Sequence, residues 1–360
     1  MYTVLGEEGA TTLPADAALE GRRPTMRDVA SRAGVSLKTV SRVLNGESGV
    51  HVETAERVRV AARELRFVRN ESAATLKRSG QRSRSIGLVL ENVANPYWSA
   101  LAKAVEDVAR ERGYLLTTGS SGDDPAVERE LLDELCNRRV GGLLIVPSGA
   151  ELGYLADEID HGTVVVSMDR PAAGVQVDTV LLANAAGVRD GIAHLVGAGH
   201  RRIAFVGDTV RYTGSQRLAG YREALGAAGL PLDRKLVRRA HDAEHAREAA
   251  RELLALDEPP TAIFAGNNLL TRGVLEALGR RRHEIAVVGF DDFAFAELMD
   301  PPVTVVGQDA AELGRSGARQ LFRRLDGESG PVQEIVLATT LVARGSGEIS
   351  PCAAGRPLTS

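Results

Sequence analysis

The chain has 360 residues, of which 44% are hydrophobic and 26% are charged, so it can build a sizeable core and two or three folding units. Its first twenty residues contain four acids and no apolar run, which argues against a signal peptide there. No later stretch reaches the roughly 18 apolar residues of a membrane-spanning helix. We therefore expect a cytoplasmic protein.

Charge is distributed unevenly along the chain, although the net charge is only −4. The segment from Arg22 to Arg84 holds 15 Arg and Lys but 6 Asp and Glu, whereas the remainder holds 29 basic and 42 acidic residues. A basic segment on an acidic body indicates a nucleic-acid partner, because neutralising phosphates releases counterions. Charge alone leaves a solvated basic face equally open.

Cysteine and histidine give no strong sign of a metal site. Cys136 and Cys352 are far apart and form no C-x-x-C pair, so neither a disulfide framework nor a zinc site is indicated. His241 and His245 are spaced i, i+4 and can begin a metal site, but no third ligand is evident from the sequence. We favour a solvated helix face and expect neither a metal nor a cofactor.

Three short helices are predicted near the amino terminus, after a tail at 1–23 without periodicity. Thr25 can cap the first helix, which Gly34 ends. The second spans 37–44 and the third 54–65, and together they predict a small all-α bundle. Its expected buried residues are Val29, Ala30, Ala33, Val40, Val43, Leu44, Val58, Ala61, Ala62 and Leu65.

From Ser85 to about Ala343 short apolar runs alternate with helical patterns. The predicted strands are 86–90, 143–146, 164–166, 203–206, 262–265 and 285–288. The predicted helices are 97–112, 126–138, 183–197, 215–228, 243–256 and 268–278. Apolar strands alternating with helices predict parallel sheets covered on both faces. About 260 residues exceed one compact sheet, so we expect an α/β core of two doubly wound lobes with a cleft between them.

These patterns define the expected domains. A flexible tail covers 1–23, a small all-α domain 24–69, a linker 70–84, a two-lobed core 85–345, and a tail 346–360. Within the core, the amino-terminal lobe is expected at about 85–180 and 308–327, and the carboxy-terminal lobe at about 181–307 and 328–345.

The stretch TMRDVASRAGVSLKTVSRVLNG at 25–46 carries a specific signal. It is long, ungapped and closely resembles the helix-turn-helix headpiece of the lactose/galactose repressor family of bacterial transcription regulators. The physical logic agrees, since Gly34 permits a sharp turn and Val35 and Val40 can lock the second helix onto the first, freeing its other face for a major groove.

By this resemblance the base-reading residues are Leu37, Lys38 and Arg42. Arg42 and Lys38 can donate to guanine acceptors, whereas Leu37 can offer only apolar contact, for example to a thymine methyl. Small donors suited to phosphates or base edges are Ser36, Thr39, Ser41 and Asn45.

Residues 70–76, NESAATL, resemble the hinge helix of the same family, in which paired helices enter the minor groove. The resemblance implies that Leu76 wedges into a central base step, with Ala73 at the helix contact and Lys77 among the DNA-contacting residues. Packing of Leu76 against the core is the alternative. Glu71 is acidic near phosphates, which would make hinge affinity modest.

The resemblance continues to about Gly347 and implies a core similar to periplasmic sugar-binding proteins. Its implied effector contacts are Asp169, Arg217, Asn267 and Asp291, at strand or loop ends facing the cleft. Tyr97 and Trp98 are a candidate apolar platform for a sugar ring or base, with a structural role equally open. Relatives usually carry Asp where this chain has Asn268, which we interpret as a helix cap.

Two other functions compete with that of a regulator. A sugar-binding receptor or transport component would use such a core, but the basic headpiece and the lack of an export signal argue against it. An enzyme is disfavoured because there is no phosphate-binding loop and no nucleophile elbow. We therefore expect a homodimeric repressor of carbohydrate-related genes, not an enzyme, which binds a pseudo-palindromic operator and is controlled by a small molecule, most simply a sugar.

Overall fold

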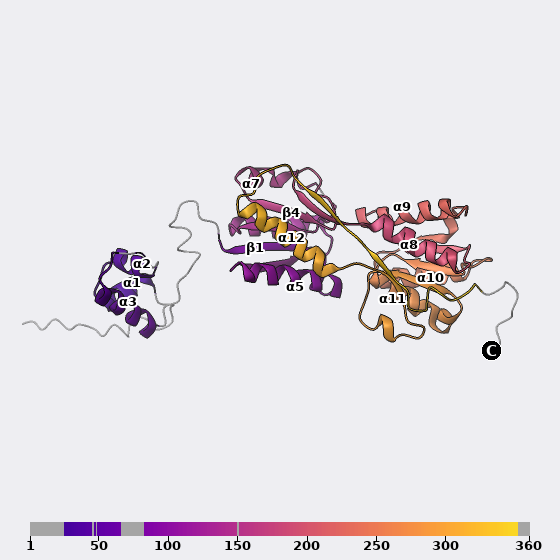
Figure 1. The fold of residues 1–360 in the computed structure, drawn as a ribbon, viewed down its shortest axis with the longest axis horizontal. Helices are drawn as coiled ribbons and strands as arrows, with labels where there is room; N and C mark the ends of the chain where they lie inside the picture. The colour runs from indigo at the N-terminus through magenta and orange to yellow at the C-terminus, as the bar shows by residue number, and fades with distance from the viewer. Residues whose placement is uncertain (1–24, 45–46, 48, 66–82, 150, 352–360) are drawn as a thin grey trace, which may run out of the picture. The chain divides into compact units, whose positions relative to one another are not determined.

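The computed structural model describes the chain except for residues 1–24, 45–46, 48, 66–82, 150 and 352–360 (Figure 1). The chain divides into two compact units, residues 1–81 and residues 82–360. We describe each by itself. The predicted hinge at 70–76 lies outside the described residues, and so does Asn45.

The first unit contains the three predicted helices, α1 (Met26–Ala33), α2 (Leu37–Leu44) and α3 (Val52–Glu64). At the start of α1 the backbone N–H of Thr25 donates to Asp28 Oδ2 at 2.6 Å, and Gly34 ends the helix at a φ of 64°. Six of the ten residues predicted to be buried are so, namely Val29, Ala30, Ala33, Val40, Val58 and Ala61. The other four are partly buried and pack against them.

The amino-terminal lobe of the second unit is built on a six-stranded sheet in the order β11-β5-β4-β3-β1-β2, with every pairing parallel. Its strands are β1 (Ser85–Leu90), β2 (Leu115–Ser120), β3 (Gly142–Ile145), β4 (Val164–Met168), β5 (Asp178–Leu182) and β11 (Glu334–Leu337). Its helices are α5 (Pro96–Glu111), α6 (Pro125–Asn137), η2 (Gly153–Leu155), α7 (Ala156–Asp160) and α12 (Ala310–Leu325).

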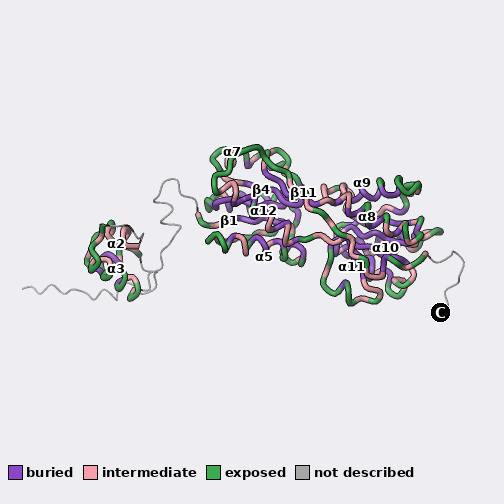
Figure 2. Tube along the Cα trace, in the orientation of Figure 1, coloured by how far each residue is buried: buried purple, intermediate pink, exposed green. Residues whose placement is uncertain are grey.

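Both faces of this sheet are covered, and the strand side chains alternate between them. In β1, Ile86 and Leu88 belong to the apolar cluster formed with α5 and α12, whereas Val89 belongs to the cluster formed with α6. The buried strands therefore form the middle layer of the lobe, as Figure 2 shows.

The carboxy-terminal lobe repeats this plan with the sheet order β12-β10-β9-β8-β6-β7. Its strands are β6 (Ile203–Gly207), β7 (Val237–Arg239), β8 (Ala262–Ala265), β9 (Ala286–Phe290), β10 (Thr304–Gly307) and β12 (Thr340–Val342). Its helices are α8 (Asn184–Gly197), α9 (Tyr212–Ala227), η3 (Arg234–Leu236), α10 (Ala243–Leu254), α11 (Asn268–Leu278), η4 (Gly279–His283) and η5 (Ala296–Leu298). Helices α8 and α9 cover one face and α10 and α11 the other. Within this described sheet, only β12 runs antiparallel to its neighbour.

The chain crosses between the lobes three times, from β5 to α8, from β10 to α12 and from β11 to β12. The yellow carboxy-terminal segment in Figure 1 makes the last crossing. One expected boundary is corrected here. The sequence assigns residues 328–345 to the carboxy-terminal lobe, but β11 pairs with β5, so residues 334–337 belong to the amino-terminal lobe.

Candidate functional site

Helix α2 offers a polar surface opposite the core of the headpiece. Ser36 caps the helix, because the backbone N–H of Thr39 donates to its hydroxyl at 3.1 Å. Val40 is buried, Lys38 is exposed, and Leu37, Ser41 and Arg42 are partly buried.

Arg42 also makes an ion pair with Glu47, with 3.5 Å between Nε and Oε2, and 43% of its side-chain surface is exposed. The guanidinium group is thus accessible at the solvent side of the helix. Four of the predicted DNA contacts, Asn45, Ala73, Leu76 and Lys77, lie outside the described residues and stay predictions.

A polar pocket lies between the lobes of the second unit and brings together all six predicted effector residues, Tyr97, Trp98, Asp169, Arg217, Asn267 and Asp291. Further residues that line it are Glu91, Asn95, Arg170, Asp208, Arg211, Thr213, His241, Asn268 and Gln308. They come from both lobes, so the lobes must keep their relative positions for the pocket to exist.

Asp169 and Asp291 occupy equivalent positions in the two lobes. Each directly follows a strand, β4 or β9, and each has a φ of 66°. The backbone N–H of each continues the sheet, donating to the carbonyl of Val180 at 2.8 Å and of Val306 at 3.0 Å. Aspartate tolerates this left-handed conformation better than most residues. The turn directs both carboxylates into the pocket at the carboxyl ends of the strands.

Both carboxyl groups are buried, and this changes their acidity. Burial raises the pKa of Asp291 to about 6, against the opposing charge of Arg217. Burial likewise raises the pKa of Asp169, against the charge of Arg170. Both carboxyl groups are therefore harder to ionise than carboxyl groups in water.

Arg217 is held firmly in place on α9. Its Nε donates to Asn184 Oδ1 at 2.8 Å, its Nη1 donates to the carbonyl of Gly266, and Nη2 lies 3.9 Å from Asp291 Oδ1. The guanidinium carbon also lies 3.8 Å from the centre of the Phe290 ring. A guanidinium fixed on this many sides gives the pocket a preorganised donor.

The helix cap at the start of α11 is the residue before the one expected. Asn267 caps the helix, since the backbone N–H of Leu270 donates to its Oδ1 at 2.8 Å. The prediction that Asn268 is the cap is therefore wrong. Its Nδ2 instead donates across the cleft to Asn95 Oδ1 at 2.9 Å. Asn268 is thus a contact between the lobes.

Tyr97 and Trp98 pack edge to face, with 4.8 Å between ring centres, and only 9% and 5% of their surfaces are exposed. Both belong to the apolar core of the amino-terminal lobe. The Tyr97 hydroxyl is buried and finds no hydrogen-bond partner among the described residues. A buried hydroxyl without a partner is costly, which favours a ligand or water contact for Tyr97.

Comparison with known proteins agrees with both units. Residues 25–70 match the bacterial regulatory proteins of the lacI family, and residues 192–347 match the periplasmic binding protein-like domain. The chain is 39% identical to the transcriptional regulator CelR of Thermobifida fusca, over 91% of this chain and 99% of CelR. It is 32% identical to the regulator DegA of Bacillus subtilis, over 90% of this chain and 98% of DegA. The chain belongs to the lacI family.

Solved structures of this family show the same fold. A complex of CelR with cellobiose is 34% identical, covers 90% of this chain and all of that chain, and superposes with a TM-score of 0.66. A lac repressor dimer bound to operator and an anti-inducer is 26% identical, covers 91% of this chain and 99% of that chain, and gives a TM-score of 0.77.

As a member of the lacI family, this chain is a DNA-binding transcriptional regulator. The resemblance noted in the sequence and the two-lobed α/β core are both confirmed. The curated relatives compared with it are regulators rather than enzymes. Among the described residues, none of the helices is long and apolar enough to cross a membrane.

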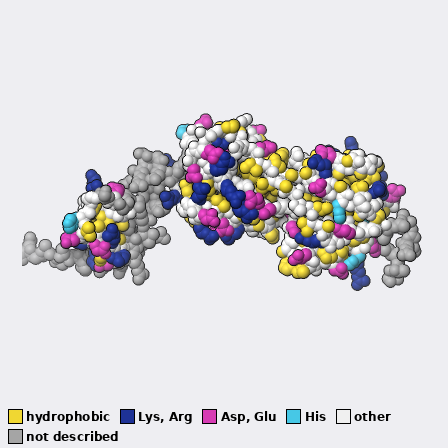
Figure 3. All heavy atoms as spheres, viewed as in Figure 1, with side chains coloured by type: hydrophobic (Ala, Val, Ile, Leu, Met, Phe, Trp, Pro, Cys, Tyr) yellow, Lys and Arg dark blue, Asp and Glu magenta, His cyan; other side chains and the backbone are white. Residues whose placement is uncertain are grey.

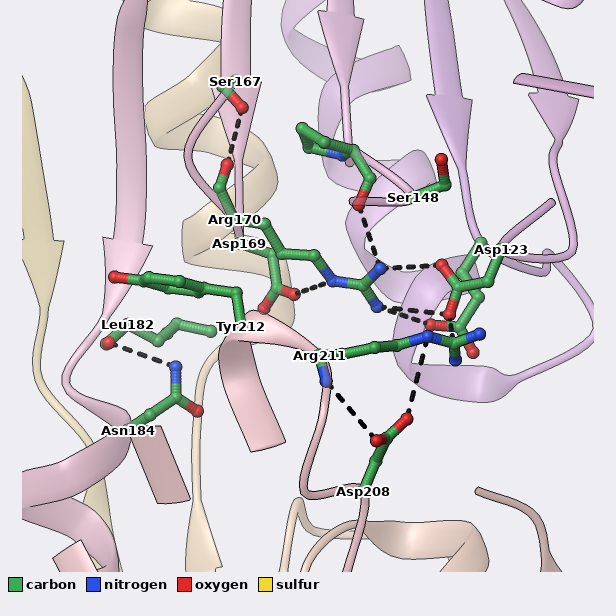
Figure 4. Close-up of polar contacts among 12 residues, drawn as sticks. Asp123, Ser148, Ser167, Asp169, Arg170, Leu182, Asn184, Asp208, Arg211 and Tyr212 are labelled. Carbon is green, nitrogen blue, oxygen red and sulfur yellow. Dashed lines mark hydrogen bonds and ion pairs between the residues drawn. The ribbon is translucent and has the colours of Figure 1, made fainter. Parts of the chain in front are cut away.

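The sequence did not reveal a charged network beside the pocket. Arg170 donates to Asp123 Oδ1 at 2.7 Å and to Glu91 Oε2 at 2.9 Å. Arg211, from the opposite lobe, lies 2.5 Å from Asp123 Oδ2. Figure 4 shows the two guanidinium groups directed to the same carboxylate. In the sequence Arg170 directly follows Asp169 at the end of a predicted strand, and this position was the feature that could have identified Arg170 as a residue of the pocket.

Burial, with a further contribution from the Asp123 carboxylate, raises the pKa of Glu91 to about 7. Its protonation state therefore changes near neutral pH. Because Glu91 lines the pocket, this change alters the charge that a bound molecule meets.

Proposed function

We propose that this regulator represses carbohydrate-related genes and that a sugar bound between its lobes controls its affinity for operator DNA. The observation that carries the proposal is the pocket, in which the six predicted residues, hydrogen-bonding groups beside two aromatic rings, come together from both lobes. The CelR–cellobiose complex of a relative supports the choice of ligand.

The chemistry of the pocket suits a molecule with several adjacent hydroxyl groups. Ionised Asp169 and Asp291 accept hydrogen bonds, and Arg217 donates them, so a hydroxyl can satisfy both kinds of partner. The unpartnered Tyr97 hydroxyl adds one more group that a sugar can satisfy. Binding such a ligand by only one lobe would leave half of these groups unused.

Effector binding can therefore be coupled to the relative positions of the lobes. The three crossings are natural hinge segments, because few residues in them must change conformation when one lobe rotates. A ligand that binds one arrangement more tightly shifts the equilibrium toward it. In a homodimer this rotation would change the separation of the two amino-terminal lobes and, through the hinges, operator affinity.

For DNA binding we propose that α2 enters the major groove, with Arg42 and Lys38 donating to guanines and Leu37 in apolar contact. The paired hinges would place Leu76 in the minor groove. Two headpieces in a homodimer then require a pseudo-palindromic operator, and the protein would act in the cytoplasm, where that DNA lies.

The test is operator binding by the purified full-length protein at physiological salt, titrated with cellobiose, other mono- and disaccharides, and nucleobases. We expect one sugar to change operator affinity, and Asp291→Ala to abolish that change while leaving DNA binding intact. Arg42→Ala should weaken specific DNA binding to the same extent with and without the sugar.

Equal affinity for the operator and a scrambled duplex would contradict the DNA-binding part of the proposal. If the operator is bound specifically but no sugar acts at any concentration, the effector class is wrong. The effector class is also wrong if a nucleobase acts in place of a sugar.

A further inference from the structure

Two histidines and an aspartate gather at the amino end of α10, where the sequence had offered only two possible ligands. One ring nitrogen each of His241 and His245 and one oxygen of Asp242 lie within 4.8 Å of one another. We propose that these three side chains bind a divalent transition-metal ion, with Zn²⁺ as the simplest example. Two imidazoles and a carboxylate are a donor set that zinc prefers in proteins.

The distances suit such an ion. His241 Nε2 lies 3.3 Å from Asp242 Oδ2. Two donors bound tetrahedrally at about 2.0–2.1 Å from one ion are separated by roughly 3.3–3.4 Å. The imidazole rings of His241 and His245 are 4.1 Å apart between centres, so both nitrogens can reach a common point after small side-chain rotations. All three side chains are about half exposed, which gives an ion free access.

The helix holds the carboxylate in place before any ion arrives. Asp242 caps α10, its Oδ1 accepting from the backbone N–H of His245 at 2.9 Å, and the His245 Nδ1 lies 2.8 Å from the same oxygen. Such hydrogen bonds orient a ligating carboxylate. The backbone hydrogen bond is made to Oδ1 and leaves Oδ2 directed to His241.

The proposed ion site adjoins the pocket between the lobes on one side and solvent on the other. His241 lines the pocket between the lobes, whereas His245 lies one helical turn further along the solvent side of α10. Three protein ligands leave at least one tetrahedral position open for water or another oxygen donor. Ion binding itself requires neither a sugar nor DNA, so it can be tested without assuming the function proposed above.

The experiment is a calorimetric titration of the tag-free full-length protein with Zn²⁺, repeated with Co²⁺, whose visible absorption reports its coordination. Because thiols also bind zinc, every protein carries Cys136→Ser and Cys352→Ser. We expect one site per chain, weakened at least tenfold by His241→Ala and by His245→Ala. Asp242→Asn retains the helix cap but loses the charge, so it should weaken ion binding without lowering Tm.

His283→Ala is the matched control. His283 is also half exposed and also near a carboxylate, with 3.9 Å to Asp300, but no second histidine joins it in a ligand cluster of the described residues. This variant should bind Zn²⁺ with the same affinity as the parent protein, which carries only Cys136→Ser and Cys352→Ser. The proposal is overturned if the parent protein binds no Zn²⁺, or if it binds Zn²⁺ with an affinity that all three site variants retain. Circular dichroism of each variant confirms that α10 is still folded.

Discussion

Arg211 and Asp123 form an ion pair that joins the two lobes, with 2.5 Å between Nη1 and Oδ2. Asp123 is buried in the amino-terminal lobe and is also bound by Arg170 of the same lobe. Arg211 therefore binds to a carboxylate that already has one partner. Its separate effect is to hold the lobes together, along with the hydrogen bond between Asn268 and Asn95.

Arg211→Ala should open the cleft with a modest loss of stability. The Arg211 side chain is 37% exposed and the Asp123 side chain, 3% exposed, keeps Arg170 as a partner, so losing the pair should cost about 1–2 kcal/mol of unfolding free energy. A small energy of this kind is enough to change the populations of two lobe arrangements. Fluorescence energy transfer between labels on the two lobes should report a longer distance. Arg222→Ala, an exposed position on the same helix, is the control, and an equal change in both variants would contradict the prediction.

Glu91→Gln should stabilise the protein increasingly as pH rises. In the folded protein the pKa of Glu91 is about 7, above its ordinary value of 4.5, so the ionised form is the less favourable one. The wild type therefore loses stability between about pH 4.5 and 7, and the neutral glutamine does not. Because the side chain is 29% exposed, we expect a gain of roughly 1–3 kcal/mol at pH 8.

The measurement is the Tm of the core transition for both proteins from pH 5 to pH 8. The difference in Tm should grow up to about pH 7 and then stay constant. A difference that does not depend on pH would show that the Glu91→Gln substitution acts through packing rather than charge.

Arg217→Ala should destabilise the core strongly, because it removes a buried cation and leaves Asp291, Asn184 and the carbonyl of Gly266 without their partner. Breaking a buried charge pair by removing one member costs about 3 kcal/mol or more. Urea unfolding measures this loss, and Arg217→Lys should fall in between, since lysine keeps the charge but not the planar fork. Arg272→Ala, in an exposed pair on α11, should stay within about 0.5 kcal/mol of wild type.

Arg42→Ala should weaken binding to the cognate operator by about 1–3 kcal/mol and relax the preference for guanine at one position of each half-site. Competition with single-base variants of the operator measures this directly. Arg63→Ala, an exposed arginine of α3, is the charge-matched control. It should lower affinity for every sequence equally or not at all. If Arg42→Ala weakens all duplexes uniformly, Arg42 binds phosphate rather than a base.

The sequence predicts the central strands and most helices because they carry continuous or periodic apolar patterns. It misses the four edge strands, β2, β7, β11 and β12, whose residues are all exposed or partly buried. Two further strands, β5 and β10, and helix α12 are missed as well, although they are largely buried. The misassignment of residues 334–337 to the carboxy-terminal lobe follows from the missing β11.

In the candidate site, too, the residues that stand in local sequence motifs are predicted, whereas contacts between residues distant in the sequence are not. Asp169, Asp291 and Arg217 are found in the sequence because each stands in a recognisable local motif. The partners of Asp123 are not, since Arg170 lies 47 positions further along and meets it only through the fold of the amino-terminal lobe, and Arg211 lies 88 positions further along in the other lobe. Asp242 was beside His241 in the sequence, but the cap geometry that directs its carboxylate to the histidines is visible only in three dimensions.

Charged side chains of both signs are interspersed over the face of the core drawn in Figure 3, so that surface offers no single-sign patch to DNA. The basic excess lies instead between Arg22 and Arg84. DNA affinity should therefore depend on salt mainly through the headpiece and hinge.

Because the polypeptide passes between the lobes three times, neither lobe is an uninterrupted stretch of the gene. A single proteolytic cut in one crossing leaves two covalent connections intact, so it cannot release either half. Grafting the carboxy-terminal lobe of a relative onto this protein would need three splice junctions rather than one. Recombination at a single breakpoint within the core would mix strands of the two parents in at least one sheet, whereas exchange of the headpiece needs only one junction.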